Sequence, residues 1–193
     1  MTESQHATSD RELPGGGIPT AVNVDHVAYT VPDLQQAIDF FVTVLGAELL
    51  YREPTVRSIG DTWMTDALNV HPESEADIAA LRLGPTLNVE LFEYRAPDQR
   101  KTMPRNSDIG GHHLAFFVTD IDLATDYLRS QDGVRVLGDP KAVEHGPIAG
   151  DRWVYFLSPW GMQLELIQLP AQLPYEKHTP YRRFGPCRSW DER

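Results

Sequence analysis

The sequence predicts an α+β fold made of two tandem βαβββ modules, because the second part of the chain repeats the first. A shift of 87 residues aligns residues 26–34 with residues 113–121. A shift of 75 residues aligns residues 89–92 with residues 164–167. In each copy an alternating run of β-branched and aromatic residues, typical of a strand, precedes a helical pattern.

The first strand of each copy is predicted over residues 22–31 and residues 113–118. Asp33 and Asp120 follow these strands, where an aspartate accepts hydrogen bonds from the free N–H groups of a starting helix. Three further strand-like segments follow each helix. They are residues 48–52, 78–83 and 87–94 in the first copy, and residues 134–137, 152–157 and 162–169 in the second.

These elements define the expected domain organisation. Residues 1–20 are rich in polar residues and glycine, so we expect a disordered tail. The paired βαβββ domain is expected over residues 21–169, and residues 170–193 form a C-terminal extension without clear periodicity. Within the domain, module one is residues 21–95 and module two is residues 109–169, and the first copy carries an irregular insertion at residues 60–77.

Composition narrows the possible partners of this 193-residue chain. With 17 Lys and Arg against 28 Asp and Glu, the net charge of −11 disfavours nucleic acids and anionic membranes. No apolar run approaches the roughly 20 residues of a bilayer helix, and the start lacks the pattern of a signal peptide, which favours a cytoplasmic protein without a membrane contact. The single cysteine, Cys187, excludes an intrachain disulfide and a cysteine-based zinc site. A small molecule is the expected partner.

Four side chains able to bind a metal occupy equivalent positions in the two copies: His26, Glu90, His113 and Glu165. Alone, a histidine in an apolar strand is more often a core residue, and a glutamate more often lies on a surface. Their repetition favours a shared site, and each glutamate has apolar neighbours that make an unpaired carboxylate costly to bury. Two imidazoles and two carboxylates suit a divalent Zn, Mn, Fe, Co or Ni ion better than Ca or Mg.

The segments around these residues resemble the vicinal oxygen chelate superfamily, which includes glyoxalase I, methylmalonyl-CoA epimerase, extradiol dioxygenases and bleomycin-resistance proteins. The resemblance rests on residues 24–28, residues 110–116 and the Pro-Trp-Gly at residues 159–161, and it covers residues 22–169. It implies that the modules form a cupped, eight-stranded mixed sheet around a metal held by the four residues. His113 rather than its neighbour His112 is taken as the ligand, because the repeat places it opposite His26.

The resemblance also implies the reaction class. Members of the superfamily bind substrates through two neighbouring oxygens, and a glutamate in both modules points to the branch without redox chemistry. Segments 91–94, 146–153 and 174–176 resemble cyclitol epimerases. This implies a metal-dependent epimerase, an isomerase that acts beside the carbonyl of a cyclitol ketone such as 2-epi-5-epi-valiolone through a metal-stabilised enediolate. Glu165 and Glu90 are the candidate proton-transfer residues, with His145 as a secondary candidate. A homodimer is also expected.

Alternative functions remain open at this stage: a glyoxalase I-type lyase, a methylmalonyl-CoA epimerase, an extradiol-type dioxygenase or an antibiotic-binding resistance protein. The acyl-CoA epimerases that the chain resembles usually carry glutamine at the position of Glu90. A binding protein of this fold needs no metal ligands. Three further residues either contact substrate or serve as ordinary surface and packing residues: Arg82, Arg152 and Trp160. The C-terminal segment 175–190 covers the cup or contacts a second chain.

Overall fold

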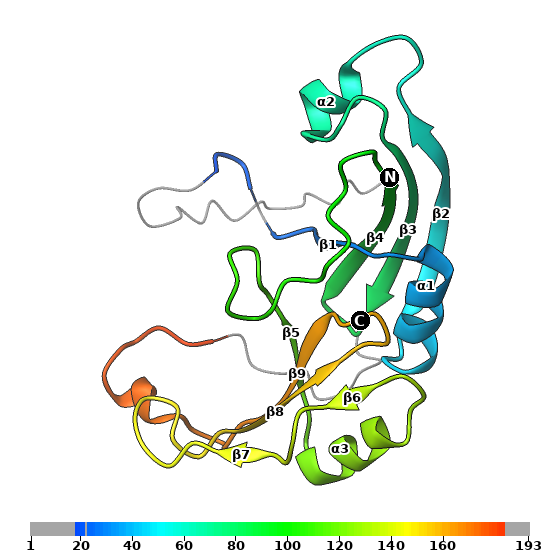
Figure 1. Ribbon diagram of the computed structural model, residues 1–193. Coiled ribbons are helices and arrows are strands. Elements are labelled where there is room, and N and C mark those ends of the chain that lie inside the picture. The colour runs from blue at the N-terminus through cyan, green and yellow to red at the C-terminus, as the bar shows by residue number, and fades with distance from the viewer. Residues whose placement is uncertain (1–17, 22, 184–193) are drawn as a thin grey trace, which may run out of the picture.

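The computed structural model describes residues 18–21 and 23–183 (Figure 1). Most of the predicted tail and the last ten residues of the extension, including Cys187, lie outside this range. The first module contains β1 (His26–Thr30), α1 (Leu34–Thr43), β2 (Glu48–Arg57), α2 (Trp63–Leu68), β3 (Glu75–Leu83) and β4 (Leu87–Arg95). The second contains β5 (Leu114–Phe117), α3 (Ile121–Arg129), β6 (Arg135–Val136), β7 (Lys141–Ala142), β8 (Arg152–Leu157) and β9 (Gln163–Gln168), followed by the short 3₁₀ helix η1 (Pro174–Lys177).

Each module forms its own mixed sheet. The strand order is β1-β4-β3-β2 in the first and β5-β9-β8-β6 in the second, with β7 also paired to β8. In both sheets the first strand is parallel to the last, and the other pairs are antiparallel. The registers agree as well, because Ala28 lies opposite Glu90 and Ala115 lies opposite Glu165. The predicted α+β class and the repeated topology are therefore confirmed.

The helices begin where the sequence predicts. The Asp33 carboxylate accepts a hydrogen bond from the backbone N–H of Gln36 at 2.8 Å. The Asp120 carboxylate accepts two, from the backbone N–H groups of Asp122 and Leu123. These bonds satisfy donors that have no partner inside the helix, so they fix the first turn of α1 and α3.

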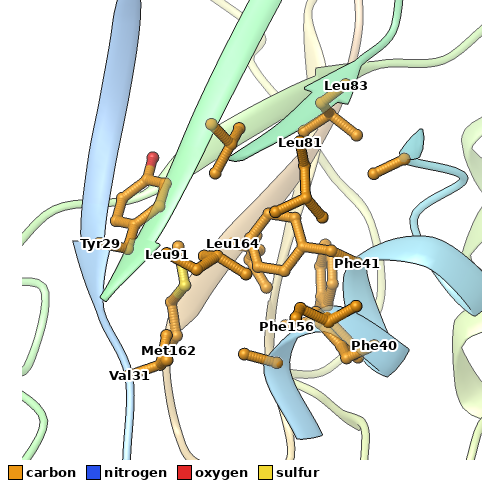
Figure 2. Packing of buried hydrophobic residues seen from close by; sticks show 14 of the residues in the cluster. Tyr29, Val31, Phe40, Phe41, Leu81, Leu83, Leu91, Phe156, Met162 and Leu164 are labelled. Atoms are coloured by element: carbon orange, nitrogen blue, oxygen red, sulfur yellow. The ribbon is translucent and has the colours of Figure 1, made fainter. Parts of the chain in front are cut away.

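A single hydrophobic core joins the two modules. Figure 2 shows Phe40 and Phe41 of α1 among Leu81 and Leu91 of the first sheet and Phe156 of the second. Trp160, in the turn between β8 and β9, packs edge-on against Phe40 at a ring distance of 5.3 Å. Because α1 contributes to the packing of both sheets, the two modules are expected to unfold together.

Successive side chains of a strand point to opposite faces of its sheet. In each sheet the predicted metal ligands therefore lie on the face that is turned away from this core. On β4, Val89 and Leu91 lie in the core and Glu90 points the other way. On β9, Leu164 and Leu166 lie in the core on either side of Glu165. Since both sheets turn their apolar faces toward one core, their glutamate-bearing faces point away from it.

The structure adds three elements that the sequence pattern did not reveal. The insertion at residues 60–77 contains α2, whose Met64 is fully buried, and the strand before it extends to Arg57. A two-residue strand, β7, lies before the loop that carries His145, and η1 lies in the C-terminal extension. None of the helices in the part of the chain that the structure describes is long and apolar enough to cross a bilayer.

Candidate metal centre

His26 and Glu90 form the first half-site. His26 begins β1, and parallel pairing of β1 with β4 brings its Nε2 atom to 3.2 Å from Oε2 of Glu90. On the other side of the ring, Nδ1 lies 2.9 Å from Oδ2 of Asp25. The hydrogen bond with Asp25, together with the negative charge of Glu90, raises the pKa of His26. Both side chains remain partly exposed.

His113 and Glu165 form the second half-site. His113 lies just before β5, and Glu165 lies on β9. Nε2 of His113 lies 3.1 Å from Oε2 of Glu165, and its Nδ1 lies 3.0 Å from Oδ1 of Asn106. Glu165 is 8% exposed, and burial raises its pKa, although the nearby His113 acts in the opposite direction. The ring of Tyr155 packs edge-on against His113 at 5.1 Å. This half-site is therefore more enclosed than the first.

The atoms of both half-sites fit a divalent transition-metal ion. In each, an acceptor oxygen lies beside Nδ1, which favours a proton on that nitrogen and leaves the Nε2 lone pair free beside a carboxylate oxygen. Together they offer two nitrogen and two oxygen ligands. Among the described residues of one chain, however, no group of three or more metal-binding side chains comes together. The structure thus brings the four predicted ligands together as two pairs rather than one cluster.

The other predicted residues have distinct surroundings. His145 is exposed in the loop between β7 and β8. His112 stacks on Tyr29 at a ring distance of 5.3 Å. Arg82 pairs with a glutamate of β2, Glu48, at 2.6 Å. Arg152 makes two 2.8 Å hydrogen bonds to the aspartate at the start of α3, so both arginines are held by acids within the chain.

Sequence reasoning missed the residues that hold the two imidazoles. Asp25 directly precedes a predicted ligand, and this adjacency was the available signal. Asn106 lies in the connection between the modules, where the sequence suggested only a turn. The turn role falls instead to Asp108, whose carboxylate accepts from the backbone N–H of Arg105 at 2.8 Å. Because Asn106 reaches His113 across an irregular loop, no strand or helix periodicity marks it.

A cavity of about 510 Å³ includes Tyr94 in its lining, a residue on the same face of β4 as Glu90. It is bounded by the end of β1, the connection between the modules and Trp160, and none of the four predicted ligands lines it. Neither half-site is fully enclosed, since the side chains of His26 and His113 are 39% and 32% exposed. Substrate enclosure at a half-site therefore requires a surface from outside that module's own sheet.

Comparison with known proteins agrees with this architecture. The model of the Glyoxalase/Bleomycin resistance protein/Dioxygenase superfamily matches residues 25–156, and the chain belongs to that superfamily. A 2-epi-5-epi-valiolone epimerase of Actinomyces sp. is 60% identical over 180 residues, which cover 93% of this chain and 97% of that protein. The uncharacterised protein YaeR of Escherichia coli is 28% identical over 145 residues, 75% of this chain and 95% of its own length.

Solved structures share the fold at lower identity. A glyoxalase family protein from Bacillus cereus matches with a TM-score of 0.59 and 21% identity, covering 79% of this chain and 99% of that one. A glyoxalase/bleomycin resistance protein/dioxygenase domain from Frankia sp. matches with a TM-score of 0.54 and 19% identity, over 78% of this chain and all of that one. These matches support the architecture of the chain and carry no information on its substrate.

Proposed function

We propose that this protein is a metal-dependent epimerase that inverts a carbon beside the carbonyl of a cyclitol ketone, with 2-epi-5-epi-valiolone as its substrate. The observation that carries this proposal is the 60% identity, over 93% of the chain, to an enzyme named for that reaction. Two His–Glu pairs at equivalent places in a duplicated fold support it independently, because they supply both metal ligands and carboxylates for proton transfer.

The metal is assigned to His26, Glu90, His113 and Glu165, with Zn, Mn, Fe, Co and Ni as the ions that suit this donor set. When bound, such an ion supplies Lewis-acid polarisation of the carbonyl and of the neighbouring oxygen of the substrate. The chain's own contribution before binding is orientation: Asp25 and Asn106 hold the imidazole rings so that both Nε2 atoms lie beside a glutamate oxygen.

A homodimer completes the site in this proposal. Each chain displays the two half-sites on separate faces, so a second copy related by a twofold axis brings its second half-site to the first half-site of its partner, and the reverse. The twofold symmetry then produces two equal sites per dimer. Large apolar side chains exposed on these faces support an interface: Tyr51 of β2, opposite Ala80, and Phe117 of β5, opposite Ile167.

Proton transfer is assigned to the two glutamates. Glu165 is the base, because burial weakens its acidity and makes its carboxylate a stronger proton acceptor than an exposed one. It removes the proton from the hydroxyl-bearing carbon beside the carbonyl. The C–H electron pair becomes the carbon–carbon double bond, and the π electrons of the carbonyl move to its oxygen to give an enediolate. Glu90, from the other module, returns a proton on the opposite face of the ring. His145, exposed in the loop between β7 and β8, is the secondary candidate for proton transfer.

The test is isotope exchange during turnover. The protein with its metal, incubated with 2-epi-5-epi-valiolone in deuterium oxide, should place deuterium at the inverted carbon, as detected by NMR and mass spectrometry. Glu165→Gln should slow the exchange by at least about a hundredfold, whereas Glu73→Gln, at an exposed glutamate outside both half-sites, should leave it unchanged. Inversion without deuterium incorporation would exclude the enediolate route, and wild-type protein inactive on this ketone would exclude the substrate.

A further inference from the structure

Asp151, immediately before β8, is a buried carboxyl group that the proposed reaction leaves without a role. The residue is 2% exposed, and its Oδ1 atom has no hydrogen-bond partner. Burial raises the pKa of Asp151, although the charge of Arg183 and the backbone of Arg152 act in the opposite direction. A buried polar oxygen without a partner costs on the order of 1–3 kcal/mol, so its presence calls for a ligand that satisfies it.

The position of Asp151 places it on the side of the sheet that carries the second half-site. The ladder between β7 and β8 extends to this residue, because the backbone N–H of Val143 donates to the Asp151 carbonyl at 2.8 Å. Along β8, Val154 and Phe156 point into the core. Alternation therefore places Asp151 on the face of Trp153 and Tyr155. Tyr155 is the β8 residue opposite Glu165.

Electrostatics agrees with this placement, since the charge of Asp151 contributes to the raised pKa of Glu165. The C-terminal extension contacts the loop between β7 and β8, because the backbone N–H of Tyr175 donates to the Pro147 carbonyl at 3.0 Å. The charge of Arg183 also reaches Asp151 and partly stabilises its carboxylate.

We propose that Asp151 binds substrate by accepting a hydrogen bond from a ring hydroxyl that lies away from the reacting carbon. The inference rests on the proposed function and names the group that recognises a polyhydroxylated ring. A hydroxyl donor satisfies the free Oδ1 atom, and a substrate that lacks the hydroxyl leaves this oxygen unpaired, so the contact discriminates between ring substitution patterns. It is a binding contact, distinct from the proton transfer assigned to the glutamates.

The test compares Asp151→Ala with Asp151→Asn, whose amide oxygen still accepts a hydrogen bond. Binding of 2-epi-5-epi-valiolone is measured by calorimetry, and KM and kcat by the NMR assay of inversion. Asp151→Ala should weaken binding and raise KM by about tenfold or more with little change in kcat, because a buried hydrogen bond is lost. Asp151→Asn should stay within about threefold of wild type. Asp132→Asn, at an exposed turn, serves as the matched control.

Melting temperature and metal content are recorded for each variant. Metal content should be maintained in both Asp151 variants, because Asp151 lies outside the assigned ligand set, and the melting temperature verifies that each variant is folded. Unchanged affinity and KM in Asp151→Ala, or an equal loss in Asp151→Asn, would overturn the assignment while leaving the epimerase proposal intact. A wild-type protein that neither binds nor inverts the ketone would overturn both.

Discussion

Asp25 and Asn106 show how two different side chains perform one task at equivalent places. Each presents an oxygen to the Nδ1 atom of a histidine, at 2.9 Å and 3.0 Å respectively. Asp25 comes from the residue next to its histidine and Asn106 from the connection between the modules. An oxygen acceptor at Nδ1 selects the tautomer that leaves Nε2 free for a metal, and it also fixes the plane of the ring.

Removing these oxygens should weaken metal binding. For Asp25→Ala and for Asn106→Ala we expect a loss of about 10- to 100-fold in affinity, the range typical of partners that orient metal-bound histidines. Competition titration with a chelator measures the affinity, and ¹⁵N NMR of the imidazole rings reports the tautomer in the metal-free protein. Asp25→Asn keeps an acceptor oxygen and should recover most of the loss. Unaltered affinity in both alanine variants would refute the orienting role.

The residue scale also shows what the sequence predicts well. His26 and Glu90 were predicted because their counterparts recur at fixed offsets, and the structure pairs them at 3.2 Å. Asn106 has no counterpart that marks it, and it reaches His113 from an irregular segment. Repetition thus identifies strand residues of the candidate site, whereas residues supplied by loops become visible only when the fold brings them near.

At the scale of elements, α1 connects the two sheets. Its start is set by a local interaction, the Asp33 cap, which is why the sequence predicts it. The N-cap residue of α2, Thr62, makes no comparable side-chain cap bond, and this six-residue helix depends instead on the burial of Met64. A short helix stabilised by tertiary packing leaves little periodic signal, so the insertion was predicted as irregular.

Phe41 tests the role of α1. It is fully buried in the core shared by both sheets, so Phe41→Ala should lower the free energy of unfolding by about 3–5 kcal/mol. Leu123→Ala, at a residue of α3 that is 70% exposed, should change it by less than about 1 kcal/mol. Chemical denaturation followed by tryptophan fluorescence and by circular dichroism measures both. Two separate transitions in the wild-type protein would show that the modules are independent.

At the scale of the whole molecule, the duplication explains both the fold and the division of the site. The repeat predicts two modules, and the structure confirms their matching strand order. The packing of the modules depends on which face of each sheet the core covers. Contacts between residues far apart in the sequence, such as Phe40 and Trp160, decide which face that is. The shared core covers the helix-bearing faces and leaves the two half-sites on outer faces of the chain, and the proposed homodimer joins them.

Subunit complementation tests this central claim most directly. His26→Ala and His113→Ala should each be inactive as homodimers, since every site lacks one ligand. In a mixed dimer, one site lacks both histidines and the other contains an intact His26 from one chain and an intact His113 from its partner. Random exchange makes about half of the dimers mixed, so about a quarter of wild-type activity and metal content should return on mixing. Failure of the mixed protein to recover either one, with subunit exchange verified by native mass spectrometry, would contradict a site shared between two chains.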